Sequence, residues 1–278
     1  MPRPALQDVR FHNPRLARIG VEVMTLAELR RRTGAALGAP ERVDFLMLLL
    51  VQAGRGQHSV DFARVPLAAG TLLVVKPGQV HRWQPEPALQ GRLVLVAGDA
   101  LDAKLLALPD WPATARPSRA LFRHALATAA RLQADLDAFA GTDLEAAFIR
   151  HELMALLLRL ARECRPVAPA PEGSIHRLFL RELEAHFHRR LSVLDYARRL
   201  GYSESTVSRA CVAATGITAK EAIDRRVALE ARRLLAHGDD SVVQVAHRLG
   251  FSEPTNFVKF FRRTCGCTPL AFRSRARG

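Results

Sequence analysis

The C-terminal part of the chain contains the stretch Ser192-Val-Leu-Asp-Tyr-Ala-Arg-Arg-Leu-Gly-Tyr-Ser-Glu-Ser-Thr206. The same pattern returns without gaps 49 residues later, as Ser241-Val-Val-Gln-Val-Ala-His-Arg-Leu-Gly-Phe-Ser-Glu-Pro-Thr255. Seven of the ten residues that follow Tyr196 are identical in the second copy. Each copy opens with a serine that can cap a helix and continues with apolar residues on one helical face. The repeat therefore predicts the same helical motif twice.

Small residues within each copy indicate that the motif is a helix-turn-helix. In the first copy Ala197 lies four residues before Gly201, and the second copy repeats this spacing. Alanine lets a second helix cross closely, and glycine supplies the positive φ that a tight turn between helices needs. Ser203 and Ser252 are expected to cap the second helix of each copy, whose outer face is then free to enter a major groove. Two ordinary helical hairpins of a bundle would not need these identities in register.

The charge distribution agrees with a nucleic-acid partner. The chain has a formal net charge of +14, and residues 174–278 carry 19 Lys and Arg against 10 Asp and Glu. The first 173 residues carry 22 against 17. Basic residues that neutralise phosphates release condensed counterions, so a local excess favours a polyanionic partner. An arginine-rich genome would raise the same count, and charge alone therefore does not decide the partner.

The segment between the two copies is expected to be one unbroken helix over residues 218–236. Such a helix has about 19 residues and is about 28 Å long at 1.5 Å per residue. That length suits two recognition helices held about one DNA turn, ~34 Å, apart on the same side of a duplex. One chain could then read two consecutive segments of the major groove.

Residues 174–278 resemble the AraC/XylS family of transcription regulators. The resemblance is carried by motifs in both copies and in the connecting helix: Ala197-x-x-x-Gly201-Tyr-Ser203, Ser208-Arg209, Thr215-Gly216-Ile-Thr218, Arg226-x-x-x-Glu230-Ala231-x-x-Leu234-Leu235, Val245-Ala246-x-x-x-Gly250-Phe251, Asn256-Phe-x-x-Phe-Phe-Arg-Arg-x-x-Gly266 and Thr268-Pro269-x-x-Phe272-Arg273. The first copy departs from the family pattern at Cys211 and Val212, where Phe and Lys are usual. Its second helix is therefore expected to make fewer phosphate contacts.

The resemblance implies that the second helix of each copy contacts DNA. Arg209 is the main candidate for base readout, because a guanidinium can bond guanine O6 and N7 together. The alternative is that Arg209 is solvated or touches only phosphate. The second copy offers fewer strong donors and is expected to position the protein more than to read sequence, with Arg262 and Arg263 in phosphate contacts or ion pairs. The predicted DNA-binding residues are Ser203, Ser205, Thr206, Ser208, Arg209, Pro254, Thr255, Asn256, Lys259, Arg262 and Arg263.

The first 116 residues carry the pattern of a β domain. Four short apolar or alternating runs, bounded by Gly or Pro turns, are predicted as strands at residues 45–51, 58–62, 72–75 and 93–96. Turn residues recur about every ten positions, which favours an all-β sandwich or barrel. This zone resembles the small β-barrel (cupin) sensor domain that often accompanies such a DNA-binding domain, on the stretches Gly56-Gln-His58-Ser-Val-Asp61-Phe62 and Gly70-x-Leu-Leu-Val-Val-x-Pro77-Gly78-Gln-Val-His81-x-Trp83.

The cupin resemblance implies a ligand-binding interior, with His58, Asp61, His81 and Trp83 as candidate ligand-binding residues. The alternative is that these polar groups end strands and hold the barrel together. Metal-dependent cupin enzymes present a His-x-His pair, a Glu and a later His. Only two histidines remain here, so no metal, no cofactor and no catalysis are expected. A cupin metalloenzyme with a DNA-binding appendage is the alternative function.

Residues 117–164 change to a helical period and are predicted to form two amphipathic helices. Residues 165–173 hold three prolines and one glycine and are predicted to be an extended linker. In the family such helices commonly mediate dimerisation, so a homodimer is expected, although the helices could equally cover the barrel. The pair Cys265 and Cys267 lacks the second pair of ligands that a structural zinc site needs.

These patterns predict an α+β protein of two domains. A cupin-like β-barrel occupies residues 1–116, a helical interface segment 117–164, a linker 165–173, and an all-α domain with two helix-turn-helix motifs 174–278. The expected function is sequence-specific transcription regulation on double-stranded DNA, with a small-molecule effector and with RNA polymerase as a further partner.

No signal peptide or membrane span is visible, so we expect a cytoplasmic protein with no membrane partner. The sequence does not identify the operator, the effector or the direction of regulation, and a non-specific architectural DNA binder is a further alternative.

Overall fold

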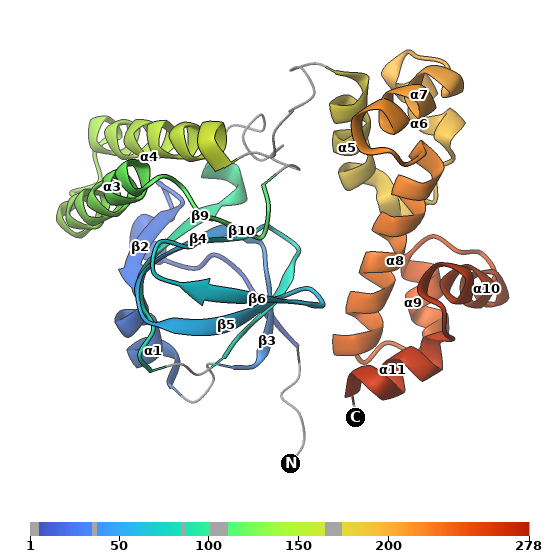
Figure 1. Ribbon diagram of the computed structural model, residues 1–278, viewed down its shortest axis with the longest axis horizontal. Coiled ribbons are helices and arrows are strands. Elements are labelled where there is room, and N and C mark those ends of the chain that lie inside the picture. The colour runs from blue at the N-terminus through green and yellow to red at the C-terminus, as the bar shows by residue number, and fades with distance from the viewer. Residues whose placement is uncertain (1–5, 35–37, 85–86, 101–110, 165–173, 278) are drawn as a thin grey trace. The chain divides into compact units, whose positions relative to one another are not determined.

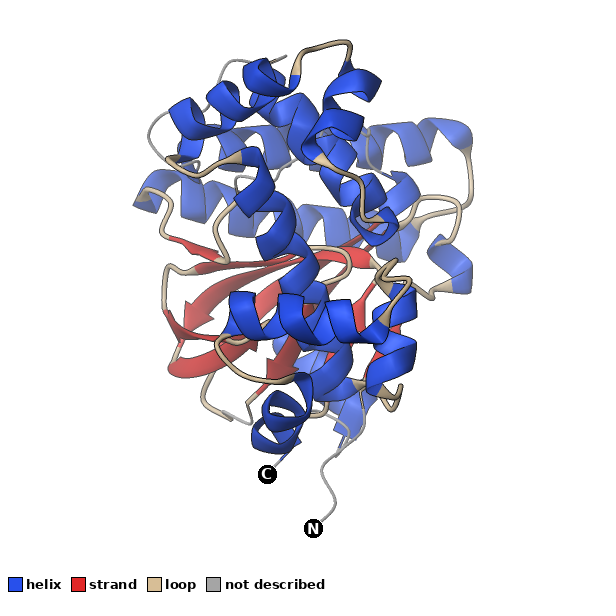
Figure 2. Ribbon diagram, turned by 90° about the vertical axis from the view of Figure 1, so that its right-hand side faces the viewer, coloured by secondary structure: helices blue, strands red, loops and turns tan. Residues whose placement is uncertain are grey.

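The computed structural model describes residues 6–34, 38–84, 87–100, 111–164 and 174–277 (Figure 1). The chain forms two compact units, one before residues 165–173 and one after them. All described strands lie in the N-terminal unit, and the described part of the C-terminal unit holds only helices and loops (Figure 2). The α+β class predicted from the sequence is therefore confirmed.

The strands of the N-terminal unit form two five-stranded sheets. The first sheet has the order β1 (Gln7–Val9), β3 (Pro40–Val43), β8 (Val80–Trp83), β5 (Arg55–Val60) and β6 (Ala63–Ala68). The second has the order β10 (Thr114–Ala115), β7 (Leu72–Val75), β4 (Phe45–Ala53), β9 (Gln90–Ala97) and β2 (Val21–Thr25). All neighbours are antiparallel except β1 and β3. Each run that the sequence predicts as a strand overlaps one of these strands.

No pairing among the described strands joins the two sheets into a closed barrel. Each sheet has one very short end strand, since β1 has three residues and β10 has two. Such short strands offer few backbone groups for further pairing, which blunts the sheet edges. The predicted cupin-like domain is therefore present as two sheets that share an apolar core, without a continuous ring of hydrogen bonds.

Strand β4 explains why residues 45–51 form an unbroken apolar run. Its odd-numbered residues pack between the two sheets, where Met47 and Leu49 share a core with Trp83 of β8. Its even-numbered residues, such as Leu48, point the other way and join the core formed with the helices. A strand buried on both faces needs no polar residue at alternate positions.

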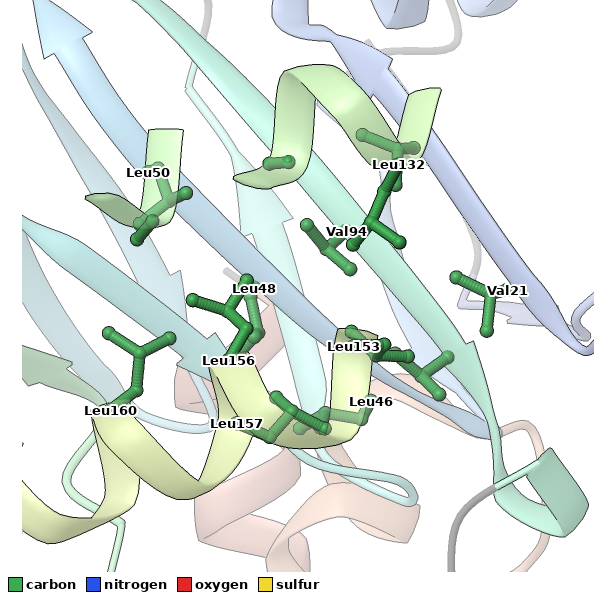
Figure 3. Close-up of a cluster of buried hydrophobic side chains, with 14 of the residues drawn as sticks. Val21, Leu46, Leu48, Leu50, Val94, Leu132, Leu153, Leu156, Leu157 and Leu160 are labelled. Atoms are coloured by element: carbon green, nitrogen blue, oxygen red, sulfur yellow. The ribbon is translucent and has the colours of Figure 1, made fainter. Parts of the chain in front are cut away.

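Helices α3 (Arg119–Ala138) and α4 (Asp143–Cys164) pack on the outer face of the second sheet. Figure 3 shows Leu153 and Leu156 of α4 lying near Leu46 and Leu48 of β4. The two helices predicted for residues 117–164 are thus present, and the sheet covers their apolar inner faces. The prediction that they could cover the β domain is confirmed by this packing.

Several elements among the described residues of the N-terminal unit are not predicted, including strands β1, β2, β3, β6 and β10 and three helical elements. The helical ones are helix α1 (Leu26–Thr33) and the short 3₁₀ turns η1 (Pro14–Leu16) and η3 (Gly98–Ala100). The side chains of Thr25 and Glu28 form a capping box at the start of α1. This Thr-x-x-Glu pattern is a signal for a helix start that the sequence does carry.

The C-terminal unit consists of helices around one core. In chain order they are α5 (Ile175–His186), η4 (Phe187–Arg189), α6 (Val193–Leu200), α7 (Glu204–Thr215), α8 (Ala219–His237), α9 (Val242–Arg248), α10 (Pro254–Cys265) and α11 (Pro269–Arg277). Helices α6 and α7 form the first predicted helix-turn-helix, and α9 and α10 form the second. The connecting helix α8 is 19 residues long, as predicted.

The turns of the two motifs have the predicted geometry. Ser192 and Ser241 cap α6 and α9, each in a capping box with the residue three positions later. Gly201 and Gly250 have φ angles of 74° and 75°, in the left-handed region. Ser203 caps α7 by accepting a hydrogen bond from the backbone N–H of Thr206. The three serines therefore cap their helices, and the two glycines adopt the left-handed conformation, as the sequence predicts.

The prediction that Ser252 caps α10 is wrong. The N-cap of α10 is Glu253, which makes no capping bond with its side chain, and Pro254 occupies the first turn. A residue before proline is pushed out of the helical region, and Glu253 accordingly has extended backbone angles of −116° and 119°. Helix α10 therefore begins one residue later than α7 does, and Ser252 lies outside it.

The two serines give a matched test of this difference. We expect Ser203→Ala to lower the free energy of unfolding of the C-terminal unit by about 1 kcal/mol, because an N-cap hydroxyl is lost. Ser252→Ala should change it by only a few tenths of a kcal/mol. Urea titration of both variants measures the difference, and an equal loss in the two variants would contradict the assignment.

Candidate nucleic-acid interface and ligand site

Helix α7 presents the outward face that the sequence predicts. Ser205 and Arg209 are exposed, whereas Val207 is fully buried in the core. Thr206 and Ser208 are half-buried at the margins of this face. The structure therefore gathers the predicted base-reading residues of the first motif on one side of a single helix.

The hydroxyl groups at the start of α7 are engaged with one another. The Ser203 Oγ lies 3.0 Å from the Ser205 Oγ and 2.7 Å from the Thr206 Oγ1, in addition to its bond with the Thr206 N–H. Arg209 is different, because it makes no hydrogen bond or ion pair with any residue in the described part of the chain. Its guanidinium is therefore available to an outside partner.

Helix α10 buries its aromatic side and exposes its polar side. Phe257, Phe260 and Phe261 lie in the core. The exposed predicted residues of this helix are Thr255, Asn256, Lys259, Arg262 and Arg263, and Pro254 is half-buried. The face offers a lysine and arginines near the helix end, and only short polar groups near its start.

Arg263 is held by contacts within the protein. Its Nη2 donates to the Asp224 Oδ2 of α8 at 3.2 Å, and its guanidinium lies 5.8 Å from the centre of the Phe260 ring. Asp224 also accepts from the Lys220 Nζ at 2.7 Å. Of the two roles that the sequence allows for Arg263, phosphate contact or ion pair, the structure shows the ion pair.

The N-terminal unit brings three of its predicted ligand-binding residues together. The His58 Nε2 lies 3.2 Å from the His81 Nδ1, and both side chains are buried. The Trp83 ring meets the His58 ring edge to face, with centres 4.6 Å apart. Strand pairing places Glu41 opposite His81, and the Glu41 Oε2 lies 3.5 Å from the His81 Nε2. These residues form a polar cluster among apolar side chains.

Burial controls the protonation of this cluster. It lowers the pKa of His58 well below its usual value, and the neighbouring His81 lowers it further. Burial also lowers the pKa of His81 to about 4 and raises the pKa of Glu41 to about 7. Both imidazoles are therefore neutral at neutral pH, and the carboxyl group is poised between its two forms.

One nitrogen of the cluster has no partner. The His58 Nδ1 is buried and makes no hydrogen bond within the described residues. If His81 donates through Nε2 to Glu41, its Nδ1 accepts from the His58 Nε2–H, which leaves the His58 Nδ1 as an acceptor. A buried acceptor of this kind costs stability unless a water or a ligand donates to it.

Asp61 has a different role from the histidines. It sits in the turn after β5 with a positive φ of 52°, and its carboxylate accepts from the Val80 N–H at 3.2 Å and from the Gln79 Nε2 at 3.0 Å. These contacts hold the turn against β8, as the structural alternative for this residue predicts. Glu41, in contrast, is not among the predicted residues, because nothing in the sequence around it shows that it pairs with β8.

Metal binding, membrane spanning and thiol reactivity all depend on where side chains lie in the described part of the chain. No group of three or more His, Cys, Asp or Glu side chains there is placed to hold a metal ion. No helix there is long and apolar enough to cross a membrane. Cys211 is buried and Cys265 and Cys267 are partly buried as free thiols, and burial raises the pKa of Cys211 to about 11.

Known proteins resemble this chain in both units. The transcriptional activator RhaS of Escherichia fergusonii is 27% identical over 238 residues, which cover 83% of this chain and 85% of that protein. The regulatory protein PocR of Salmonella typhimurium is 34% identical over 105 residues, or 38% of this chain and 35% of that protein. A further similar protein is the DNA-binding domain of AdpA, a global transcriptional factor, whose structure was solved in complex with a target DNA. It is 33% identical to this chain, and the match covers 37% of this chain and 93% of that chain, with a TM-score of 0.34.

Two family models match consecutive parts of the chain. An AraC-like ligand binding domain matches residues 29–161, which hold the two sheets and the helices α3 and α4. A helix-turn-helix domain matches residues 196–275, which hold both motifs and the helix between them. Both matches agree with the polar cluster and the two outward helix faces described above. The chain therefore belongs to the AraC family of transcription regulators, with an N-terminal ligand-binding domain and a C-terminal helix-turn-helix domain that binds DNA.

Proposed function

We propose that this regulator reads its operator with α7 and α10 in two consecutive segments of the major groove, and that α7 supplies most of the sequence readout. Arg209 carries the proposal, because it is exposed on the outer face of α7 and makes no hydrogen bond or ion pair with the described residues. Arg263 of α10 is already paired with Asp224. Helix α10 is assigned mainly to positioning, through Lys259 and Arg262 on the phosphates.

The Arg209→Ala variant should lose base preference at one operator position. A bidentate contact to guanine discriminates by about 1–3 kcal/mol, which corresponds to roughly a 5- to 150-fold loss of preference. Arg262→Ala is the control, since loss of a phosphate contact weakens binding to all sequences alike and lowers the salt slope by about one. Binding of both variants to a library of randomised duplexes measures the base preference and the affinity. Unchanged selectivity in Arg209→Ala would show that Arg209 does not read a base.

We also propose that sensing belongs to residues 1–116, the dimer interface to 117–164 and DNA reading to 174–278. The exposed face of α4 supports the interface. Leu144, Phe148 and Leu158 are 82, 58 and 54% exposed, although the opposite face of the same helix is buried against the sheet. With His151 and Ala155 between them, these positions follow a spacing of four, three, four and three residues, which is the seam of a two-stranded coiled coil. A second copy of α4 is the partner that this seam fits.

Phe148→Glu should convert the dimer into a monomer, because it puts a charge in the middle of the seam. Ala127→Glu is the matched control, since it adds the same charge at an exposed position of α3. Sedimentation of the two full-length variants at the same concentration measures the oligomeric state. A Phe148→Glu protein that still sediments as a dimer would refute this interface.

The proposed effector is a small molecule that enters the N-terminal domain and donates a hydrogen bond, through a hydroxyl or an N–H group, to the His58 Nδ1. The buried His58 Nδ1, which is an acceptor without a partner among the described residues when Glu41 is ionised, supports this chemistry, and the match to a ligand-binding domain supports the location. The related RhaS proteins are described as activators. We therefore propose that the effector changes dimer geometry so that the protein activates transcription in contact with RNA polymerase.

We propose no catalytic activity for this chain. The rival function, a metalloenzyme of the cupin type, needs a metal held by His58 and His81. We expect purified protein to contain iron, manganese and zinc at well below one atom per chain by elemental analysis, with the same result for His58→Ala and His81→Ala. A stoichiometric metal in the unaltered protein that disappears from both variants would establish the rival.

A further inference from the structure

The short segment between α5 and α6 reverses the chain with an unusual backbone conformation. Arg190 has a φ of 56° and a ψ of 35°, and it shares a positive φ with only one other non-glycine residue in the described part of the chain, Asp61. Residues with a Cβ adopt this left-handed conformation only where surrounding contacts maintain it. Contacts of Arg190 with its surroundings must therefore hold this conformation.

Those contacts lie on the second helix-turn-helix motif, far along the sequence. The Arg190 guanidinium stands 4.1 Å from the centre of the Phe251 ring and 5.0 Å from that of Phe260. Phe251 directly follows the turn of the second motif, and Phe260 belongs to α10. A guanidinium over an aromatic face is attracted by the ring electrons, and more strongly when water is displaced. Arg190 is half-buried, so this contact is partly desolvated.

Among the described residues, no guanidinium stacks on the equivalent position of the first motif. Tyr202, which aligns with Phe251, is 40% exposed, whereas Phe251 is only 6% exposed. The two glycines before them differ in the same way. A Cβ on Gly250 would lie 2.5 Å from the carbonyl oxygen of His188 and 2.9 Å from the Arg190 Cγ, but a Cβ on Gly201 would meet nothing within 4 Å. The turn of the second motif is thus docked against residues 188–190.

The other end of this segment is anchored in the first half of the unit. The Arg226 guanidinium of α8 lies 3.7 Å from the centre of the Phe187 ring. The Arg226 Nε also donates to both carboxylate oxygens of Glu184 in α5, each at 2.9 Å. Residues 187–190 therefore touch α5 and α8 on one side and the second motif on the other. Helix α8 is the covalent connection between the motifs, and this segment is a second, non-covalent one.

Two charged side chains, Asp224 and Arg263, also interact with the Arg190 guanidinium. Asp224 of α8 interacts favourably with it, and Arg263 of α10 interacts unfavourably, while Asp224 and Arg263 pair with each other. Asp224 thus interacts with arginines from the two halves of the unit, in addition to its closer ion pair with Lys220. Attraction of both arginines to this carboxylate favours a close approach of the elements that carry them.

We propose that Arg190 is a positioning residue, a clamp that holds the second helix-turn-helix motif against the first half of the DNA-binding unit. Helix α8 sets the separation of α7 and α10, and the clamp sets the angle between them, so it determines which spacing of half-sites the protein accepts. The inference rests on the proposed reading of two groove segments. Arg190 acts through Phe251 and Phe260 and does not itself contact a base.

The test measures the operator spacing that full-length protein prefers. A duplex selected from random sequence by the unaltered protein is rebuilt with one or two base pairs inserted or deleted between the half-sites, and also with a single half-site. We expect Arg190→Ala to bind the selected duplex about tenfold more weakly and to lose most of its preference for that spacing, with unchanged affinity for the single half-site. Arg189→Ala, an exposed neighbour that removes the same charge, should behave like the unaltered protein.

A second variant protects the test against loss of folding. Phe251→Leu keeps an apolar side chain but removes the ring that Arg190 faces, and it should relax the spacing preference in the same way. Spacing preference retained by both Arg190→Ala and Phe251→Leu would overturn the clamp, as would an equal loss of affinity for the single half-site. An unaltered protein that is indifferent to spacing would overturn the reading of two groove segments, and the clamp with it.

Discussion

The arrangement of the DNA-binding unit depends on the packing of one helix, α8, against both helix-turn-helix motifs. Val227 and Leu235 of α8 are fully buried in a single core that also contains Val207 of α7 and Phe257 of α10. Because both recognition helices pack on the same 19-residue helix, its length and stiffness set their separation. The contacts of residues 187–190 add a restraint on rotation about that helix, which the covalent chain alone does not provide.

The two motifs share their turn and differ in what surrounds it. Their identities fall on residues that form the turn and its packing, where the same backbone geometry is needed twice. Their differences have separate consequences: Pro254 delays the start of α10, and Phe251 is buried where Tyr202 is exposed. The repeat has therefore kept its scaffold, while we propose different tasks for its two halves, readout for α7 and docked positioning for α10.

In the N-terminal unit, strand β4 packs against two sets of elements, as α8 does in the C-terminal unit. Strand β4 is buried on both faces, so the same strand supports the sensor interior and holds α3 and α4 on the outside. A change in the interior can thus reach the helices across a single layer of backbone. The polar cluster of His58, His81 and Glu41 lies in that interior, and the exposed seam of α4 lies on the far side of the helices.

Much of this protein follows from signals within a few residues of one another. Capping serines, turn glycines, the apolar run of β4 and the period of α3, α4 and α8 depend on local geometry. These signals were therefore enough to predict the two units, the two motifs and the outward position of Arg209. Even the shifted start of α10 was encoded locally, by Pro254. Tertiary structure alone decided which distant residues meet: the pairing of Glu41 with His81 depends on strand register, and the stacking of Arg190 on Phe251 depends on how α8 packs. Neither contact can be predicted from the hydrophobic period of the sequence, because the relative placement of whole elements decides which distant segments meet.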